Sequence, residues 1–159
     1  MNLLPLFQWI EESGLGRAVR ETPWAFAVIE SVHLLALAMM GGTVLLVDLR
    51  MLGLGLRQRR LRELARETQP LMTAALITMI MSGVALFSSE GVKCYYSTPF
   101  WVKMGALLAA TVYTYTIRRR MVMTAEDDSP AGRLRLVAVL SVALWFTVAA
   151  SGRWIGFSG

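Results

Sequence analysis

The sequence predicts an all-α fold: an integral membrane four-helix bundle with a short N-terminal amphipathic helix at the membrane interface. Of its 159 residues, 55% are hydrophobic and 17% are charged, and the mean hydropathy is +0.52. Soluble domains are about 45–50% apolar and about 25% charged, so an ordinary cytosolic enzyme is disfavoured. Four apolar runs approach the roughly 20 residues that a membrane-spanning helix needs. We therefore expect a single membrane domain over residues 1–159.

Residues 1–22 are expected to lie on the outer surface of the membrane. Leu3, Leu6, Phe7 and Ile10 recur at helical spacing, and the polar side chains fall between them. This pattern predicts a short amphipathic helix in the plane of the interface. The same stretch lacks the basic leader and the cleavage pattern of a secretory signal.

Each apolar run is predicted to be a transmembrane helix, because only a helix satisfies its own backbone hydrogen bonds in lipid. Pro23 suits the first turn of the first span. The connections are short, which makes successive spans antiparallel neighbours. The predicted spans cover about residues 24–47, 71–87, 100–117 and 136–154.

The distribution of arginine predicts the orientation. Eleven arginines lie in the first and third connections, and cytoplasmic loops of membrane proteins carry such an excess. We therefore expect a multi-pass protein of the bacterial inner membrane with both termini in the periplasm. Trp24, Trp101 and Trp154 fall near the outer ends of three spans, as in an aromatic belt. The eleven arginines are Arg50, Arg57, Arg59, Arg60, Arg62, Arg66, Arg118, Arg119, Arg120, Arg133 and Arg135.

The expected partners are the lipid bilayer and either a second copy of the chain or other membrane or periplasmic subunits. The net charge is +5 and the pI is about 10.0, but nucleic-acid binding is not expected, because the topology explains most of the arginines. The basic stretch 57–67 also carries two glutamates at helical spacing, so it is expected to lie against anionic headgroups. Cys94 is the single cysteine, and we expect a free thiol or an intermolecular link.

One face of the first span carries ionisable side chains. A stripe facing lipid would not carry Glu, His and Asp, so this face is predicted to look into the bundle or toward a partner subunit. Gly41 lies at its edge, where a small residue leaves room for a neighbouring helix or a flat ligand. At 100° per residue, the face consists of Glu30, His33, Leu37, Met40, Val44, Asp48 and Met51.

An outer layer of charge is predicted just above His33. Glu30, Lys103 and Arg153 share this depth, and pairing between them would reduce the cost of removing each charge from water. The plainer alternatives are that Lys103 and Arg153 extend separately to the interface and that His33 is only an interhelical hydrogen-bonding residue.

A second layer of charge is predicted at the cytoplasmic end, where Asp48, Arg50 and Arg118 lie at similar depth. Pairing within this layer would again limit the desolvation cost. A simple pair at the helix end between Asp48 and Arg50 is favoured.

Three stretches of the chain carry a family resemblance: IESVHLLALAMMGGTVLLVDLRMLGLGLR, STPFWVKMGALLAATVYTY and ASGRWIGF. Over nearly its whole length the chain resembles a bacterial four-span membrane family of unknown function. It is more distantly similar to the CopD-like and HemJ-like membrane proteins, through His33, Gly41 with Gly42, and Lys103. That distant resemblance implies membrane redox or metal chemistry: b-type haem with porphyrinogen oxidation in the HemJ-like group, and copper handling in the CopD-like group.

The leading hypothesis is a small redox-associated subunit of the inner membrane that binds b-type haem in the periplasmic half. His33 would be the axial ligand and Glu30 would orient its ring. Lys103 and Arg153 would pair with the haem propionates, and Gly41 would leave room for the macrocycle. The lack of a second catalytic group beside the single histidine disfavours, but does not exclude, an enzymatic activity of the isolated chain.

Two other functions stay open. One is transport of copper or protons along the first span, with Glu30, His33, Met40 and Asp48 as the polar path. In a copper site, His33 and Met40 would be the ligands, since thioethers suit Cu(I). The other is a structural subunit that anchors a larger membrane complex.

Overall fold

The computed structural model describes residues 3–56, 58–125 and 131–155, and these residues form helices with no strand among them. The prediction of an all-α fold is confirmed. Three helices are long and apolar enough to cross a membrane: α3 (Pro23–Leu52), α4 (Leu61–Ser89) and α8 (Ala131–Ile155). Helices of this length and composition are typical of a membrane protein.

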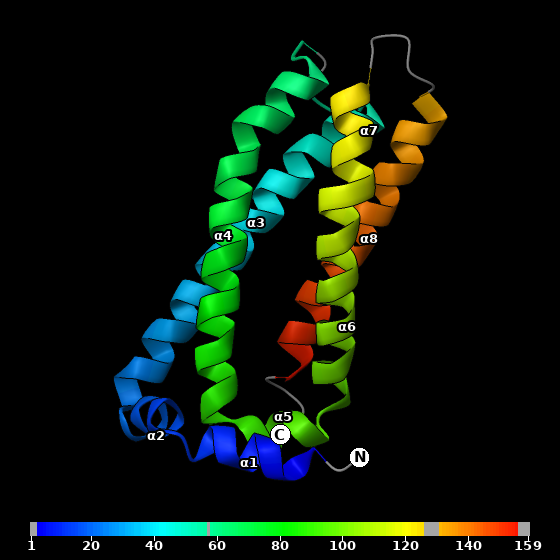
Figure 1. The fold of residues 1–159 in the computed structure, drawn as a ribbon. Coiled ribbons are helices and arrows are strands. Elements are labelled where there is room, and N and C mark those ends of the chain that lie inside the picture. Colours follow the sequence, from blue (N-terminus) through cyan, green and yellow to red (C-terminus); the bar gives the residue numbers. More distant parts are fainter. Residues whose placement is uncertain (1–2, 57, 126–130, 156–159) are drawn as a thin grey trace.

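The third predicted span is not one regular α-helix. It is divided into α6 (Thr98–Tyr113), a π-helical turn η1 (Thr114–Arg118) and α7 (Arg119–Thr124), which follow one another without a gap (Figure 1). The 16 residues of α6 extend about 24 Å, less than the ~30 Å hydrocarbon core. The π-turn holds more residues per turn than an α-helix, so the side chains of α7 are rotated relative to those of α6.

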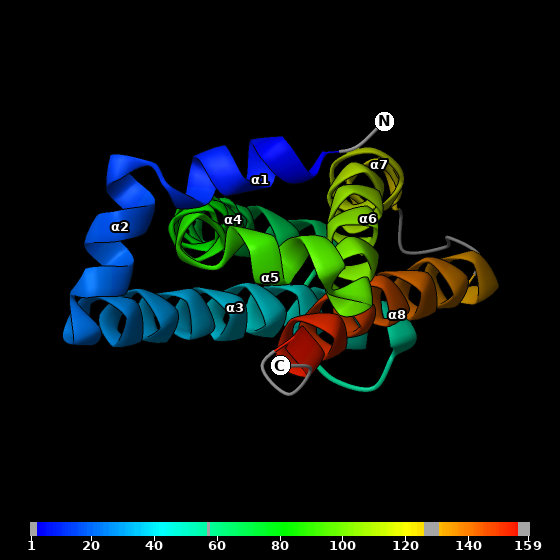
Figure 2. The same ribbon diagram turned by 90° about the horizontal axis from the view of Figure 1, so that it is seen from below.

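The long helices lie side by side. α3 packs against both α4 and α8, and α8 packs against α6 (Figure 2). α4 contacts the third predicted span, which consists of α6, η1 and α7, through α7. We call the end of the molecule at which α3 and α7 finish the arginine-rich end, and the opposite end the α1 end.

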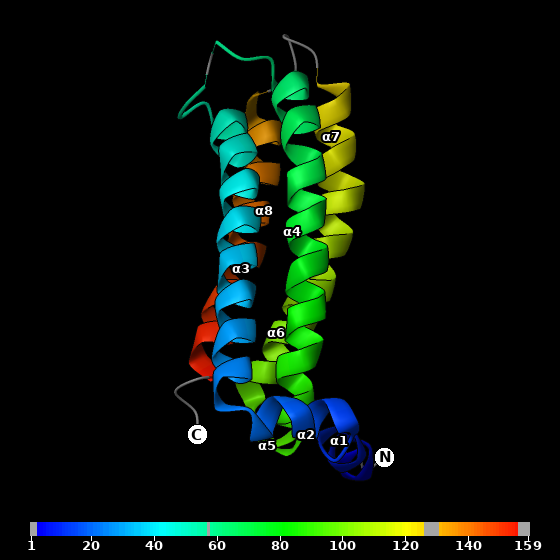
Figure 3. The same cartoon turned by 90° about the vertical axis from the view of Figure 1, so that its left-hand side faces the viewer.

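The N-terminal stretch forms two short helices, α1 (Leu4–Glu11) and α2 (Gly14–Glu21), and the prediction of a single amphipathic helix is wrong. They lie across the α1 end, with α1 beside α5 (Gly91–Tyr96) (Figure 3). The chain is divided there because Ser13 begins a new helix: its Oγ accepts a hydrogen bond of 3.2 Å from the amide of Gly16.

Aromatic contacts hold α1 against the rest of the molecule. Phe7 is buried, and its ring centroid lies 5.2 Å from that of Phe87 and 5.3 Å from that of Tyr95. Such edge-to-face pairs add to the free energy of burial. Leu3 and Leu6, which the spacing places on the same apolar face as Phe7, are exposed, so only part of that face packs against the rest of the protein.

The inward face predicted for the first span is confirmed from His33 to Met51. His33, Met40, Val44 and Asp48 are buried in α3. Glu30, at the start of the predicted face, is exposed. It precedes His33 by three residues, which rotates it about 60° away from that side chain.

Gly16 provides a test of how α2 docks. A Cβ atom at Gly16 would collide with the backbone carbonyls of Ser88 and Glu11, whereas a Cβ atom at Gly14 meets nothing within 4 Å. Gly16→Ala should therefore lower the free energy of unfolding by about 1–3 kcal/mol, as overpacking does. Thermal unfolding in detergent measures this, with Gly14→Ala as the control that loses nothing. Equal stability of the two variants would contradict the docking of α2 on α4.

Candidate functional site

The imidazole of His33 is held between α3 and α4 by a hydrogen bond to Ser82. Its Nδ1 lies 2.9 Å from Ser82 Oγ, and that hydroxyl lies 2.7 Å from the carbonyl oxygen of Thr78. A hydroxyl has one hydrogen, so if Ser82 donates to Thr78, it must accept from His33 Nδ1–H. All three groups are then satisfied, and Nε2 of His33 keeps its lone pair.

Gly83 is the small residue beside this ring. A Cβ atom at Gly83 would lie 3.3 Å from His33 Cε1, so the absence of a side chain lets α4 approach the imidazole closely. Gly41, which the sequence singles out, has no atom within 4 Å of its Cβ position. Sequence reasoning missed Ser82 and Gly83; the only available signal is that two small residues lie in the second apolar run at the depth of His33.

The predicted outer layer of charge is only partly assembled. Lys103 is half-buried on α6, close enough to His33 for their charges to interact. Its Nζ lies 3.3 Å from the Cβ position of Gly152 on α8. Arg153, the next residue of α8, is exposed.

Glu30 does not take the two roles predicted for it. Among the ion pairs of the described residues, none joins Glu30 to Lys103 or Arg153. Ser82, not Glu30, holds His33 Nδ1. The reason is the rotation of Glu30 toward the exposed side of α3, which carries its carboxylate away from the interior.

A buried ion pair lies at the arginine-rich end. Arg118 Nε donates to Asp48 Oδ1 at 2.7 Å, and Arg118 Nη2 donates to the carbonyl of Val44 at 3.1 Å. The side chain of Asp48 is 0% exposed and that of Arg118 is 6% exposed. Arg50 is not part of this pair: it lies elsewhere on α3 and donates to the carbonyl of Arg59 at 2.9 Å.

The carboxylate of Asp48 has one oxygen without a partner. Asp48 Oδ2 and Ser141 Oγ are both buried, and neither has a hydrogen bond in the described structure. The side chain of Ser141 on α8 nonetheless lies beside the carboxylate of Asp48. Buried polar atoms in this position are commonly satisfied by ordered water.

The π-turn connects three helices. Thr114 accepts a hydrogen bond of 3.0 Å from the indole of Trp145 on α8, and the hydroxyl of Tyr115 lies 2.8 Å from that of Thr73 on α4. Arg118 adds the ion pair to α3. Successive side chains of η1 are therefore tied to α8, α4 and α3 in turn.

The two candidate copper ligands, His33 and Met40, do not belong to a cluster of metal-binding side chains. Met40 is buried in an apolar core cluster together with Met79 and Trp145. Within residues 3–56, 58–125 and 131–155, no group of three His, Cys, Asp or Glu side chains is arranged to hold a metal ion. His33 is the one imidazole of the chain, and the core cluster that contains Met40 and Met79 does not include it.

Cys94 lies on α5 and is a free, buried thiol. Burial raises the pKa of this thiol to about 11, and the carboxylate of Glu90 adds to the increase. The thiolate is the reactive form of cysteine, so a thiol with this pKa is unreactive at neutral pH. Of the two roles predicted for Cys94, burial favours the free thiol over an intermolecular link.

These features describe an all-helical protein with three helices of membrane-spanning length, a buried imidazole and a buried ion pair. The chain belongs to a family of unknown function, DUF6644, which residues 6–158 match. No curated protein and no solved structure matches the chain. Membership of a family of unknown function agrees with the closer of the two sequence resemblances, and the resemblance to CopD-like and HemJ-like proteins stays a prediction.

The ion pair can be tested with a double-mutant cycle. Asp48→Asn or Arg118→Gln alone should lower the free energy of unfolding by about 3–5 kcal/mol, because each leaves the other group buried and unpaired. The double variant should lose less than the sum, with a coupling of about 1–3 kcal/mol. Combining Asp48→Asn with Arg50→Gln is the matched control, in which the losses should add. Coupling to Arg50 and not to Arg118 would contradict the observed pairing.

Proposed function

We propose that this protein is a small redox-associated subunit of the bacterial inner membrane that binds b-type haem through Nε2 of His33. The observation that carries the proposal is the hydrogen bond between His33 Nδ1 and Ser82 Oγ. An imidazole whose Nδ1–H is fixed by a neighbour presents the other nitrogen as a ligand, and such support is usual for metal-bound histidine. Haem, when bound, would supply one-electron chemistry.

The groups around His33 fit a haem in several respects. Gly83 lets α4 approach the imidazole closely, and Lys103 offers a cation near it that suits a propionate. Gly41, deeper on α3, has open space at its Cβ position, as a planar macrocycle requires. Arg153 is the second candidate for a propionate. In this proposal Ser82 replaces Glu30 as the group that orients the ligand.

The proposed topology has four spans, with the third formed by α6, η1 and α7 together. Residues 98–124 extend about 40 Å at 1.5 Å per residue, enough to cross the ~30 Å hydrocarbon core. The positive-inside rule favours the arginine-rich end on the cytoplasmic side. The α1 end and both termini are then periplasmic, and His33 lies in the periplasmic half.

Copper or proton transport along the first span has less support. Between His33 and Asp48 the interior is filled by Met40, Met79 and Trp145, with further apolar side chains around them. A proton path would need polar side chains or water at this depth. An anchoring subunit without a cofactor is the outcome that would follow if no haem is found.

Absorption spectroscopy tests the haem proposal. After haem-replete expression, the purified protein should show a Soret band and contain iron, and His33→Ala should remove both while the protein still folds. Glu30→Gln is the control, and it should keep the full band because Glu30 is exposed and does not contact the imidazole. A wild-type protein without band or iron, or a His33→Ala variant with an unchanged spectrum, would refute the proposal.

Reporter fusions test the topology separately. A reporter after Gly159 should be active only as a periplasmic fusion, and one inserted at Asp128 only as a cytoplasmic fusion, because the arginines of the third connection stay inside. The reverse pattern would overturn the orientation. A reporter in the connection before α6 that lies on the same side of the membrane as Asp128 would leave three spans and would exclude the segment of α6, η1 and α7 as a span.

A further inference from the structure

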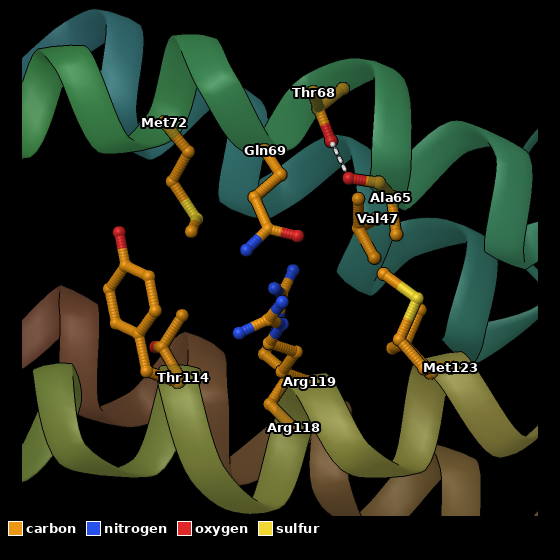
Figure 4. A pocket seen from close by; sticks show the side chains of 11 residues that line it. Val47, Ala65, Thr68, Gln69, Met72, Thr114, Arg118, Arg119 and Met123 are labelled. Carbon is orange, nitrogen blue, oxygen red and sulfur yellow. Dashed lines mark hydrogen bonds between the residues drawn. The ribbon is translucent and has the colours of Figure 1, made fainter.

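A small pocket opens between α4 and the η1–α7 segment, near the arginine-rich end (Figure 4). Its polar wall is formed by Thr68 and Gln69 of α4 and by Arg118 and Arg119, and valine, alanine and methionine side chains line much of the rest. Its volume is about 20 Å³, enough for a single water molecule. Figure 4 shows both arginine side chains extending from their helix toward Gln69.

The pocket has an uncompensated positive charge. Arg118 is neutralised by Asp48. Arg119 is exposed and forms no ion pair with any described residue. The side-chain amide of Gln69 likewise has no hydrogen bond to the described part of the chain. Since no carboxylate lines the pocket, its free donors favour an anion.

Both walls of the pocket depart from regular α-helix. Pro70 follows Gln69 inside α4, and proline removes one backbone hydrogen bond of its helix. The opposite wall contains the π-turn η1, a feature that is often found at functional sites. Gln69, which precedes the proline, and Thr114, Tyr115 and Arg118 of η1 all line the pocket.

The depth of the pocket corresponds to the headgroup boundary. The 30 residues of α3 and the 29 of α4 make helices about 45 Å long, which exceed the ~30 Å hydrocarbon core by about 7 Å at each end. Arg118 lies six residues before the end of α7, about 9 Å along the helix. When these helices are centred in the bilayer, Arg118 therefore lies close to the boundary of the hydrocarbon core, and a long side chain there can reach the phosphate groups just above it.

We propose that this pocket binds the phosphate group of an anionic phospholipid. Arg119 and the amide of Gln69 donate to its oxygens, and one oxygen takes the place of the single water that the pocket accommodates. The apolar side chains of Met72 and Met123 lie beside the glycerol and the first acyl carbons. Basic pockets between helices on the cytoplasmic side are suited to such headgroups. This proposal does not depend on haem, since it uses no residue near His33.

The test compares two neighbouring arginines. Delipidated full-length protein in detergent is titrated with short-chain phosphatidylglycerol, and the shift of the thermal unfolding midpoint gives the affinity. Arg119→Gln should weaken binding about tenfold or more, the effect of losing one charged hydrogen bond. Arg120→Gln is the control: it removes the same charge from an exposed residue that does not line the pocket, and its affinity should stay within about twofold of wild type.

Two further titrations identify the source of the phosphate. Phosphatidylcholine, which carries no net charge, should stabilise the protein much less than phosphatidylglycerol. Inorganic phosphate should also raise the unfolding midpoint less than phosphatidylglycerol does. Equal losses in Arg119→Gln and Arg120→Gln would show only general attraction to surface charge and would overturn the site. Inorganic phosphate that binds as tightly as the lipid would overturn the lipid as the ligand.

Discussion

The buried contact between Arg118 and Asp48 is the constraint on which much of the structure depends. A guanidinium and a carboxylate removed from water stabilise a protein only when each is paired, so α3 and the π-turn must stay in one register. Once this register is set, Thr114 reaches Trp145 of α8. The π-turn thus determines how the third segment sits against its neighbours.

The interior has two polar centres separated by apolar packing. His33 and Ser82 lie toward the α1 end, whereas Asp48 and Arg118 lie toward the arginine-rich end. Met40 and the other side chains of the apolar core fill the space between them. The centre at Asp48 therefore serves the architecture, while the centre at His33, whose Nδ1 is bound to Ser82, is the candidate for chemistry.

The length of the apolar runs predicted the long helices, and periodicity predicted the inward face of α3, because burial every three to four residues leaves a direct trace in the sequence. It did not predict which residues meet across helices. Ser82 was missed because nothing in a single sequence shows which part of α4 faces His33, and the π-turn was missed because no local pattern marks it. Arg118, 70 residues from Asp48, pairs with it in place of nearby Arg50, since the α3 face that carries Asp48 turns inward.

The tautomer of His33 is the most direct test of this account. His33 is the only histidine of the chain, so the nitrogen NMR spectrum of protein labelled at histidine reports one ring alone. In protein prepared without cofactor at neutral pH, Nδ1 should carry the proton and Nε2 should be unprotonated, and Ser82→Ala should remove this preference. A proton on Nε2 with a lone pair on Nδ1, or protons on both nitrogens, would contradict the assignment of Nε2 as the ligand atom.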